Sequence, residues 1–313
     1  MSRGLIKCAP VRGKLRAAAG VLLCCLVLMP GCKTSQDAAS AATQMSATAK
    51  ALSDYYAALG VILADTDQLY RVNEQLFLKP YPAQSQQLLK TTQEELARRV
   101  TLAADLSTLA GGFAKLSAST APADVAAAAA KLQTEADTLA SFKASAGEQN
   151  ALKSALQLLV TAIQEHKERE AARAMAAVAG SLSSLFVKEA PTWSSVDQVY
   201  DQLASDAASD LVDQNAVDNS GLLKVALDPF GLTPSAPSTD LNAKLAPLAK
   251  QQIATRKAAL DNSCAAATAA MTRSLQEMSE RIQLVADDKP MSFRLPPVTV
   301  AAVEQWATQI LSY

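Results

Sequence analysis

The chain contains one histidine, His166, which could transfer a proton or bind a metal. It lies on the apolar stripe of a predicted helix, and Glu170 follows one turn later on the same line. A di-iron site in a helical bundle needs a Glu-x-x-His motif on each of two helices, and zinc sites need further His or Cys ligands. We interpret His166 as part of a polar layer where the stripe drifts to the surface, and we expect no metal and no cofactor.

Cys264 is the second reactive candidate, because a thiolate can act as a nucleophile. Nucleophilic cysteines need a base and a partly open, electropositive environment. The stripe around this position instead carries Leu260, Ala267 and Met271. We predict a buried, small apolar side chain, with an intermolecular disulfide as the remaining functional alternative.

Carboxylate pairs occur at Glu94-Glu95 and at Asp287-Asp288. Adjacent residues on a helix diverge, so we interpret these acids as solvated faces. The sequence has no Gly-rich phosphate loop, GxSxG elbow, HExxH motif or EF-hand pattern. We therefore predict no catalytic residue and a protein that is not an enzyme.

Three tyrosines of the first predicted helix, Tyr55, Tyr56 and Tyr70, are candidates for a binding groove. Helical bundles can hold small apolar ligands between their helices. Core tyrosines whose hydroxyl groups reach water would explain the same pattern, and we favour that explanation.

The stretch 221–232, GLLKVALDPFGL, is apolar but not helical in its pattern. Its candidate partner contacts are Leu222, Leu223 and Phe230. We expect the stretch to fold against the end of the bundle and close the core, because soluble proteins rarely leave such patches uncovered. If it were exposed, it would mark a contact with a partner or a membrane.

The amino terminus has the composition of a secretory signal. Residues 1–16 carry five basic residues and no acid, and residues 17–29 form an uncharged apolar run. A bilayer span needs about 20 residues, so the run is too short for one. An uncleaved membrane anchor is the alternative.

The end of this segment, Met29-Pro30-Gly31-Cys32, resembles the lipobox of bacterial lipoproteins. The resemblance implies that residues 1–31 are removed and that Cys32 is acylated, for example with palmitate, as the first mature residue. Residues 32–37 would form a lipidated tether. In this class Lys33 favours sorting to the outer membrane, so we expect the chain at the periplasmic face of that membrane.

Composition restricts the possible partners. Removing residues 1–31 takes away five of the 29 basic residues and none of the 30 acids, which leaves a net charge near −6. No basic patch points to nucleic acid. The apolar half of the chain is rich in alanine, aromatics are only 4%, and no alternating β-branched run occurs, so we expect almost no sheet.

Apolar stripes with steps of three and four residues predict an all-α, elongated antiparallel bundle of five or six helices, three of them long, with coiled-coil-like packing. Residues 38–313 would form one domain with an irregular segment at 218–238. We expect the fourth helix to run from about Glu148 to Lys188, with Pro191 ending it and a fifth starting after Thr192 or Ser194. The sixth should run from Thr239 to Asp287, with a kink at Pro247 or a start just before it.

These observations favour a lipid-anchored envelope protein with a structural or interaction role. Its partners would be the membrane, through the lipid, and a protein or other envelope component. Two alternatives stay open: a periplasmic module that holds a small apolar ligand between its helices, and a membrane-active bundle whose tongue 221–232 resembles that of haemolysin-type long-helix toxins.

Overall fold

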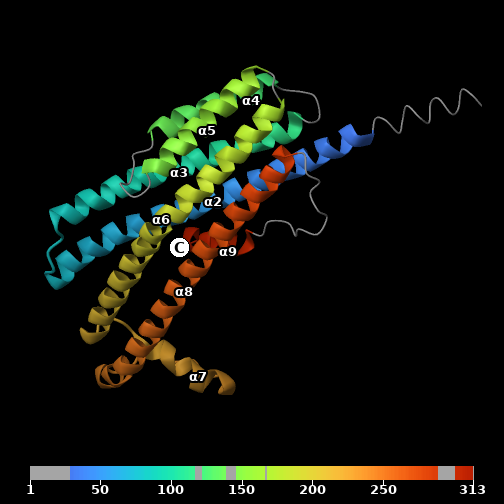
Figure 1. Cartoon of the computed structure of the whole chain (residues 1–313). Helices are drawn as coiled ribbons and strands as arrows, with labels where there is room; N and C mark the ends of the chain where they lie inside the picture. Colours follow the sequence, from blue (N-terminus) through green and yellow to red (C-terminus); the bar gives the residue numbers. More distant parts are fainter. Residues whose placement is uncertain (1–28, 117–121, 139–145, 166–167, 288–299, 313) are drawn as a thin grey trace, which may run out of the picture.

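A computed structural model describes residues 29–116, 122–138, 146–165, 168–287 and 300–312 (Figure 1). These residues form helices and turns without a strand, which confirms the predicted all-α helical bundle. The α-helices are α2 (Met29–Phe77), α3 (Ala83–Leu116), α4 (Pro122–Thr138), α5 (Ala146–Gln164), α6 (Glu168–Asp213), α7 (Lys224–Leu227), α8 (Thr239–Ala286) and α9 (Ala301–Leu311). None of the helices in these ranges is long and apolar enough to cross a membrane.

Neighbouring helices pack in an up-and-down order. Helices α2 and α3 form an antiparallel pair, α4 and α5 follow in sequence, and α6 and α8 lie along one another (Figure 1). Helix α9 packs against α2 and α8. The α6–α8 pair extends beyond the other helices as an arm, and it carries α7 at its far end, away from the start of α2 (Figure 1).

The predicted stripes account for the core. On α2 the buried positions include Met45, Leu52 and Leu59, and on α8 they include Met271 and Leu275. One cluster of buried apolar side chains joins residues from α2, α3, α4, α5, α6, α8 and α9. Its centre is aromatic: Tyr55, Tyr56, Phe186, Trp193 and Trp306 lie in a chain of ring contacts with centroid separations of 5.1–6.3 Å.

Local sequence signals account for helix ends, and the predicted start of a helix at Thr239 is confirmed. Helix α2 ends at Phe77 before the prolines at 80 and 82, and α8 starts at Thr239 after the capping residue Ser238, whose hydroxyl accepts from the Leu241 amide. Pro247 lies inside α8. Residues 33–37, expected as a tether, lie within the first turns of α2.

The predicted bounds of the fourth and fifth helices were wrong. The first of them is divided into α5 and α6, and Pro191 lies inside α6 instead of ending it. Proline removes one hydrogen bond to the carbonyl four residues earlier. Pro191 and Val187 are both exposed, so water can solvate that carbonyl, while buried Phe186 and Trp193 hold the helix on either side.

Candidate functional site

The far end of the arm is built from residues 218–238, which we call the tip. It consists of two short 3-10 turns, Asn219–Leu223 and Asp228–Phe230, on either side of α7, followed by a stretch without regular secondary structure to Ser238. The segment that we expected to be irregular therefore forms short helical turns as far as Phe230 and has no regular secondary structure only over residues 232–238. Gly231 ends the second turn with a φ of 68°, a left-handed conformation that glycine adopts without strain.

A buried asparagine fixes the root of the tip. Asn242 on α8 accepts a hydrogen bond from the Asn219 amide at 2.8 Å and donates to the Val217 carbonyl at 2.8 Å and to the Asn215 side chain. The Asp218 carboxylate caps the first turn by accepting from the Ser220 amide at 2.8 Å. The tip therefore leaves the arm at a defined place.

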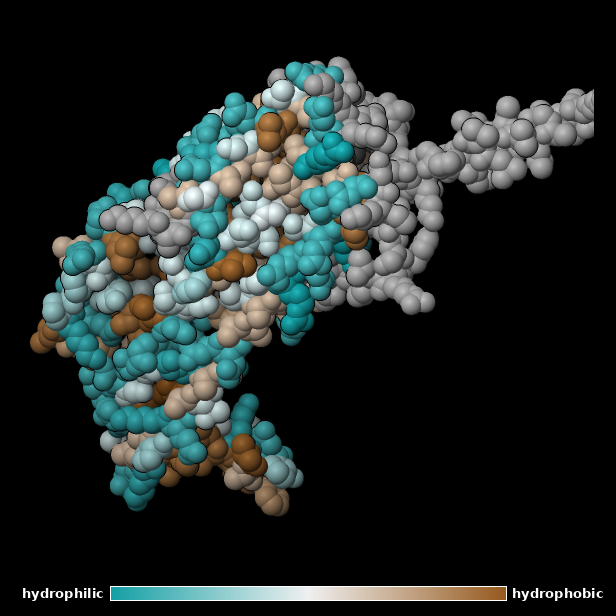
Figure 2. All heavy atoms as spheres, in the orientation of Figure 1, coloured by the Kyte–Doolittle hydropathy of each residue, from teal (hydrophilic) through white to brown (hydrophobic). Residues whose placement is uncertain are grey.

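The outer part of the tip is exposed and apolar. Val225 is 87% exposed, Phe230 77% and Leu232 56%, whereas Leu222 and Leu223 are half-buried. Figure 2 shows apolar residues on this protruding end. The prediction that the segment closes the core was wrong, because Val225, Phe230 and Leu232 lie exposed at the end of the arm and do not pack against the buried core.

The three candidate tyrosines do not form one groove. Tyr55 and Tyr56 are buried in the aromatic centre, so the core explanation is confirmed for their rings. Its expectation that the hydroxyl groups reach water was wrong, because both residues are almost fully buried and the Tyr55 hydroxyl lies 2.8 Å from the buried Thr268 hydroxyl. Burial raises the pKa of both phenols. Tyr70 lies farther along α2, stacked on Tyr81 with ring centroids 4.6 Å apart.

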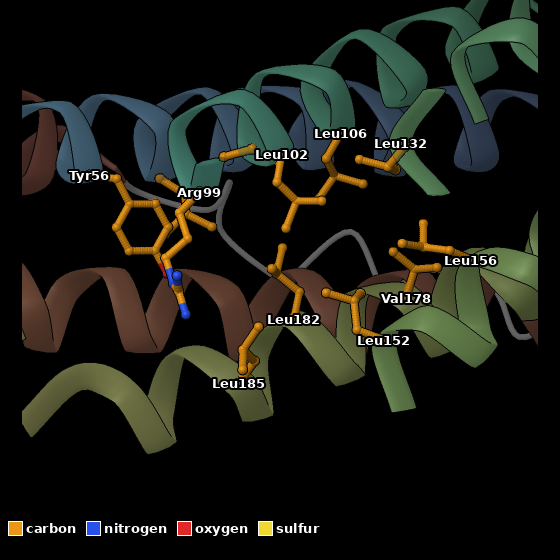
Figure 3. A pocket seen from close by; sticks show the side chains of 12 residues that line it. Tyr56, Arg99, Leu102, Leu106, Leu132, Leu152, Leu156, Val178, Leu182 and Leu185 are labelled. Carbon is orange, nitrogen blue, oxygen red and sulfur yellow. The ribbon is translucent and has the colours of Figure 1, made fainter. Parts of the chain in front are cut away.

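An enclosed cavity lies beside Tyr56 between α2, α3, α4, α5 and α6. Figure 3 shows Tyr56 and Arg99 at one end and leucines along the remainder. Its volume is about 10 Å³, which is close to the space of one water molecule. An apolar ligand would enter this space only if the helices moved apart.

Next to this cavity lies a buried ionic network. The Arg99 guanidinium donates to both oxygens of Glu189, at 2.9 and 2.6 Å, and to Glu95 at 3.1 Å, and its Cζ lies 5.2 Å from the Trp193 ring centroid. Burial would lower the pKa of Arg99, but the hydrogen bonds and charges of the two glutamates raise it above its usual value. The prediction that Glu95 lies on a solvated face was therefore wrong: Arg99, one turn later on α3, draws it inward.

Sequence reasoning missed a cluster of three carboxylates between α6 and α8. Asp197 and Asp201 are one turn apart on α6 and face Asp261 on α8, with oxygens within 4.8 Å of one another. Burial raises the pKa of Asp197 to about 6. Burial, together with the charges of Asp197 and Asp261, raises the pKa of Asp201 to about 7. The i, i+4 spacing of Asp197 and Asp201 was the available signal.

Cys264 borders this cluster and is only 2% exposed, so its predicted burial is confirmed. Burial and the charge of Asp197 raise the pKa of its thiol. A thiol with a raised pKa stays protonated and is a poor nucleophile. The side chain of Cys32 and residue His166 lie outside the described part of the structure.

No protein-family model, curated protein or solved structure matches this chain.

Proposed function

We propose that this chain is a lipid-anchored, non-enzymatic protein of the cell envelope, and that its tip binds an apolar surface of another protein. The observation that carries the proposal is the exposure of Val225, Phe230 and Leu232 on a segment that Asn242 holds at the end of the arm. Apolar side chains gathered in one place on a surface mark sites of interaction.

The position of the tip supports a role as a connector. The lipobox-like sequence ends at Cys32, close to the start of α2, and the tip lies at the end of the arm away from that start (Figure 1). With the lipid in one membrane, the arm would hold the tip away from the anchored end. We also propose that the chain is anchored in the outer membrane, because Lys33 follows Cys32, the candidate acylated cysteine.

The charge of the tip favours a protein over an anionic membrane surface. The tip carries Lys224 against Asp218 and Asp228, so its net charge is −1. Segments that bind anionic bilayers combine apolar residues with an excess of Lys and Arg, which are attracted by about 1 kcal/mol each. The tip lacks this excess, whereas apolar contact with a protein does not need it.

Co-purification of the full, tagged chain from the source envelope tests the proposal. Val225→Asp places a charge on the apolar surface, and Leu88→Asp, at a position of α3 that is 66% exposed, is the matched control. We expect one partner that wild type and Leu88→Asp both retain and that Val225→Asp loses. Loss from both variants, or from neither, would contradict a partner that binds the tip.

Vesicles test the membrane alternative. The mature chain with Cys32→Ser, which lacks the lipid, is mixed with dye-loaded vesicles containing phosphatidylglycerol. We expect neither co-sedimentation nor leakage. Binding or leakage that Val225→Asp abolishes would replace the protein partner with a membrane.

A further inference from the structure

The three carboxylates between α6 and α8 are unusual because they are buried with little positive charge nearby to balance them. Asp197 is 4% exposed and Asp201 is 3% exposed. Lys257 pairs with Asp261 at 2.8 Å, so three carboxylates and one ammonium group sum to a charge of −2. Buried charges are normally paired or bound to a metal ion.

Each of the three aspartates also has one buried oxygen without a hydrogen-bond partner among the described residues. Oδ2 of Asp197, Oδ2 of Asp201 and Oδ1 of Asp261 are all buried, and none has a hydrogen-bond donor among the residues that the structure describes. Most buried polar atoms have a partner, and each exception needs an explanation. Here three exceptions, one from each aspartate, occur in a single cluster.

We propose that Asp197, Asp201 and Asp261 bind one divalent cation of the Ca²⁺ type, which joins α6 to α8. Carboxylate oxygens are the ligands preferred by such hard cations. Oxygens bound to one Ca²⁺ at about 2.3–2.6 Å can be separated by at most about 5 Å. The oxygens of the three aspartates lie within 4.8 Å of one another, so they meet this limit without a change of backbone.

The surroundings support an oxygen site. Asp261 is only half-buried, which gives an ion and its remaining water ligands access to the cluster. Among the described residues, the group of ligand atoms that lie within 4.8 Å of one another contains the three carboxylates and not the sulfur of Cys264, so it lacks the sulfur ligand that zinc and other soft metals prefer. The bound ion would neutralise the charge of −2 and fix the two helices of the arm to each other.

Calorimetry and thermal unfolding of the full chain in detergent, freed of metals with EDTA, test this site. Ca²⁺, Mn²⁺ and Mg²⁺ are added separately as chlorides, and Zn²⁺ is added in a parallel experiment as the soft-metal comparison. We expect one Ca²⁺ per chain and a rise in Tm of roughly 5–10 °C at about 100 times the Kd. An absence of binding for all three ions would overturn the proposal, as would a response that Zn²⁺ alone produces.

Two variants separate a metal site from a structural effect. Asp201→Asn removes a ligand and also relieves repulsion, so we expect an unchanged or higher Tm without metal and loss of the Ca²⁺ response. Asp206→Asn, at an exposed position of α6, is the control and should keep the full response. If Asp201→Asn responds to Ca²⁺ as wild type does, the cluster is not the site and the carboxylates are neutralised by protons alone.

Discussion

Replacing Arg99 with methionine tests whether the buried ionic network holds α3 to α6. The side chains of Arg99 and Glu189 are each only 1% exposed and make two hydrogen bonds. Arg99→Met keeps an unbranched apolar side chain but removes the guanidinium that faces the buried Glu189 carboxylate. Removing one partner of a buried pair costs about 3–5 kcal/mol, so we expect the free energy of unfolding to fall by that amount.

Urea denaturation followed by far-UV circular dichroism measures this loss. Arg98→Met is the matched control, because the Arg98 side chain is 42% exposed and its ion pair should contribute under about 1 kcal/mol. The double variant Arg99→Met/Glu189→Met should recover most of the loss, since no charge is then left unpaired at position 189. Equal losses for Arg99→Met and Arg98→Met would refute this reasoning.

Three further predictions concern other parts of the chain. Metabolic labelling with radioactive palmitate should label wild type and leave Cys32→Ser unlabelled; equal labelling of both would contradict the lipobox assignment. Pro191→Ala should raise the free energy of unfolding in urea by roughly 1–3 kcal/mol, because an interior proline costs about 3 kcal/mol relative to alanine and this one is exposed; a decrease would show that the proline stabilises α6. In metal-free buffer, the free energy of unfolding should fall as the pH rises from about 4 to 7. The pKa values of Asp197 and Asp201 in the folded chain are about 6 and 7, so the folded chain keeps these two protons at pH values where the unfolded chain has already released them. The rise in the pKa of Asp197 from 3.8 to about 6 corresponds to about 3 kcal/mol of unfolding free energy. Urea denaturation of wild type and Asp201→Asn should therefore give free energies that diverge between about pH 4 and 7. Parallel pH curves for the two proteins would contradict raised pKa values in this cluster.

The fold was largely predictable because it follows from local rules. A stripe with steps of three and four residues specifies which face of a helix is buried, and Met45 to Thr66 on α2 obey it. Prolines at 80 and 82 end a helix, and Ser238 starts one. Pro191 does not end the helix as predicted, because the packing of Phe186 and Trp193 outweighs the loss of one backbone hydrogen bond on the exposed side of α6.

The sites were less predictable because they depend on packing between distant segments. Asp197 on α6 and Asp261 on α8 are more than 60 positions apart in the sequence. No local sequence pattern indicates that these two side chains lie close together. The apolar composition of the tip was visible, but its exposure depends on how many helices reach that end of the bundle. Glu95 was misjudged because its partner Arg99, one turn later on α3, is itself buried against Glu189 of α6.

Site-specific photocrosslinking in the intact envelope tests the proposed function most directly. A photoreactive phenylalanine analogue is placed at Phe230, which is 77% exposed on the tip, and at Leu88 on α3 as the control. We expect one protein adduct from position 230, its loss when Val225→Asp is added, and no such adduct from position 88. The same adduct from both positions, or adducts of position 230 with lipid alone, would contradict a protein partner at the tip.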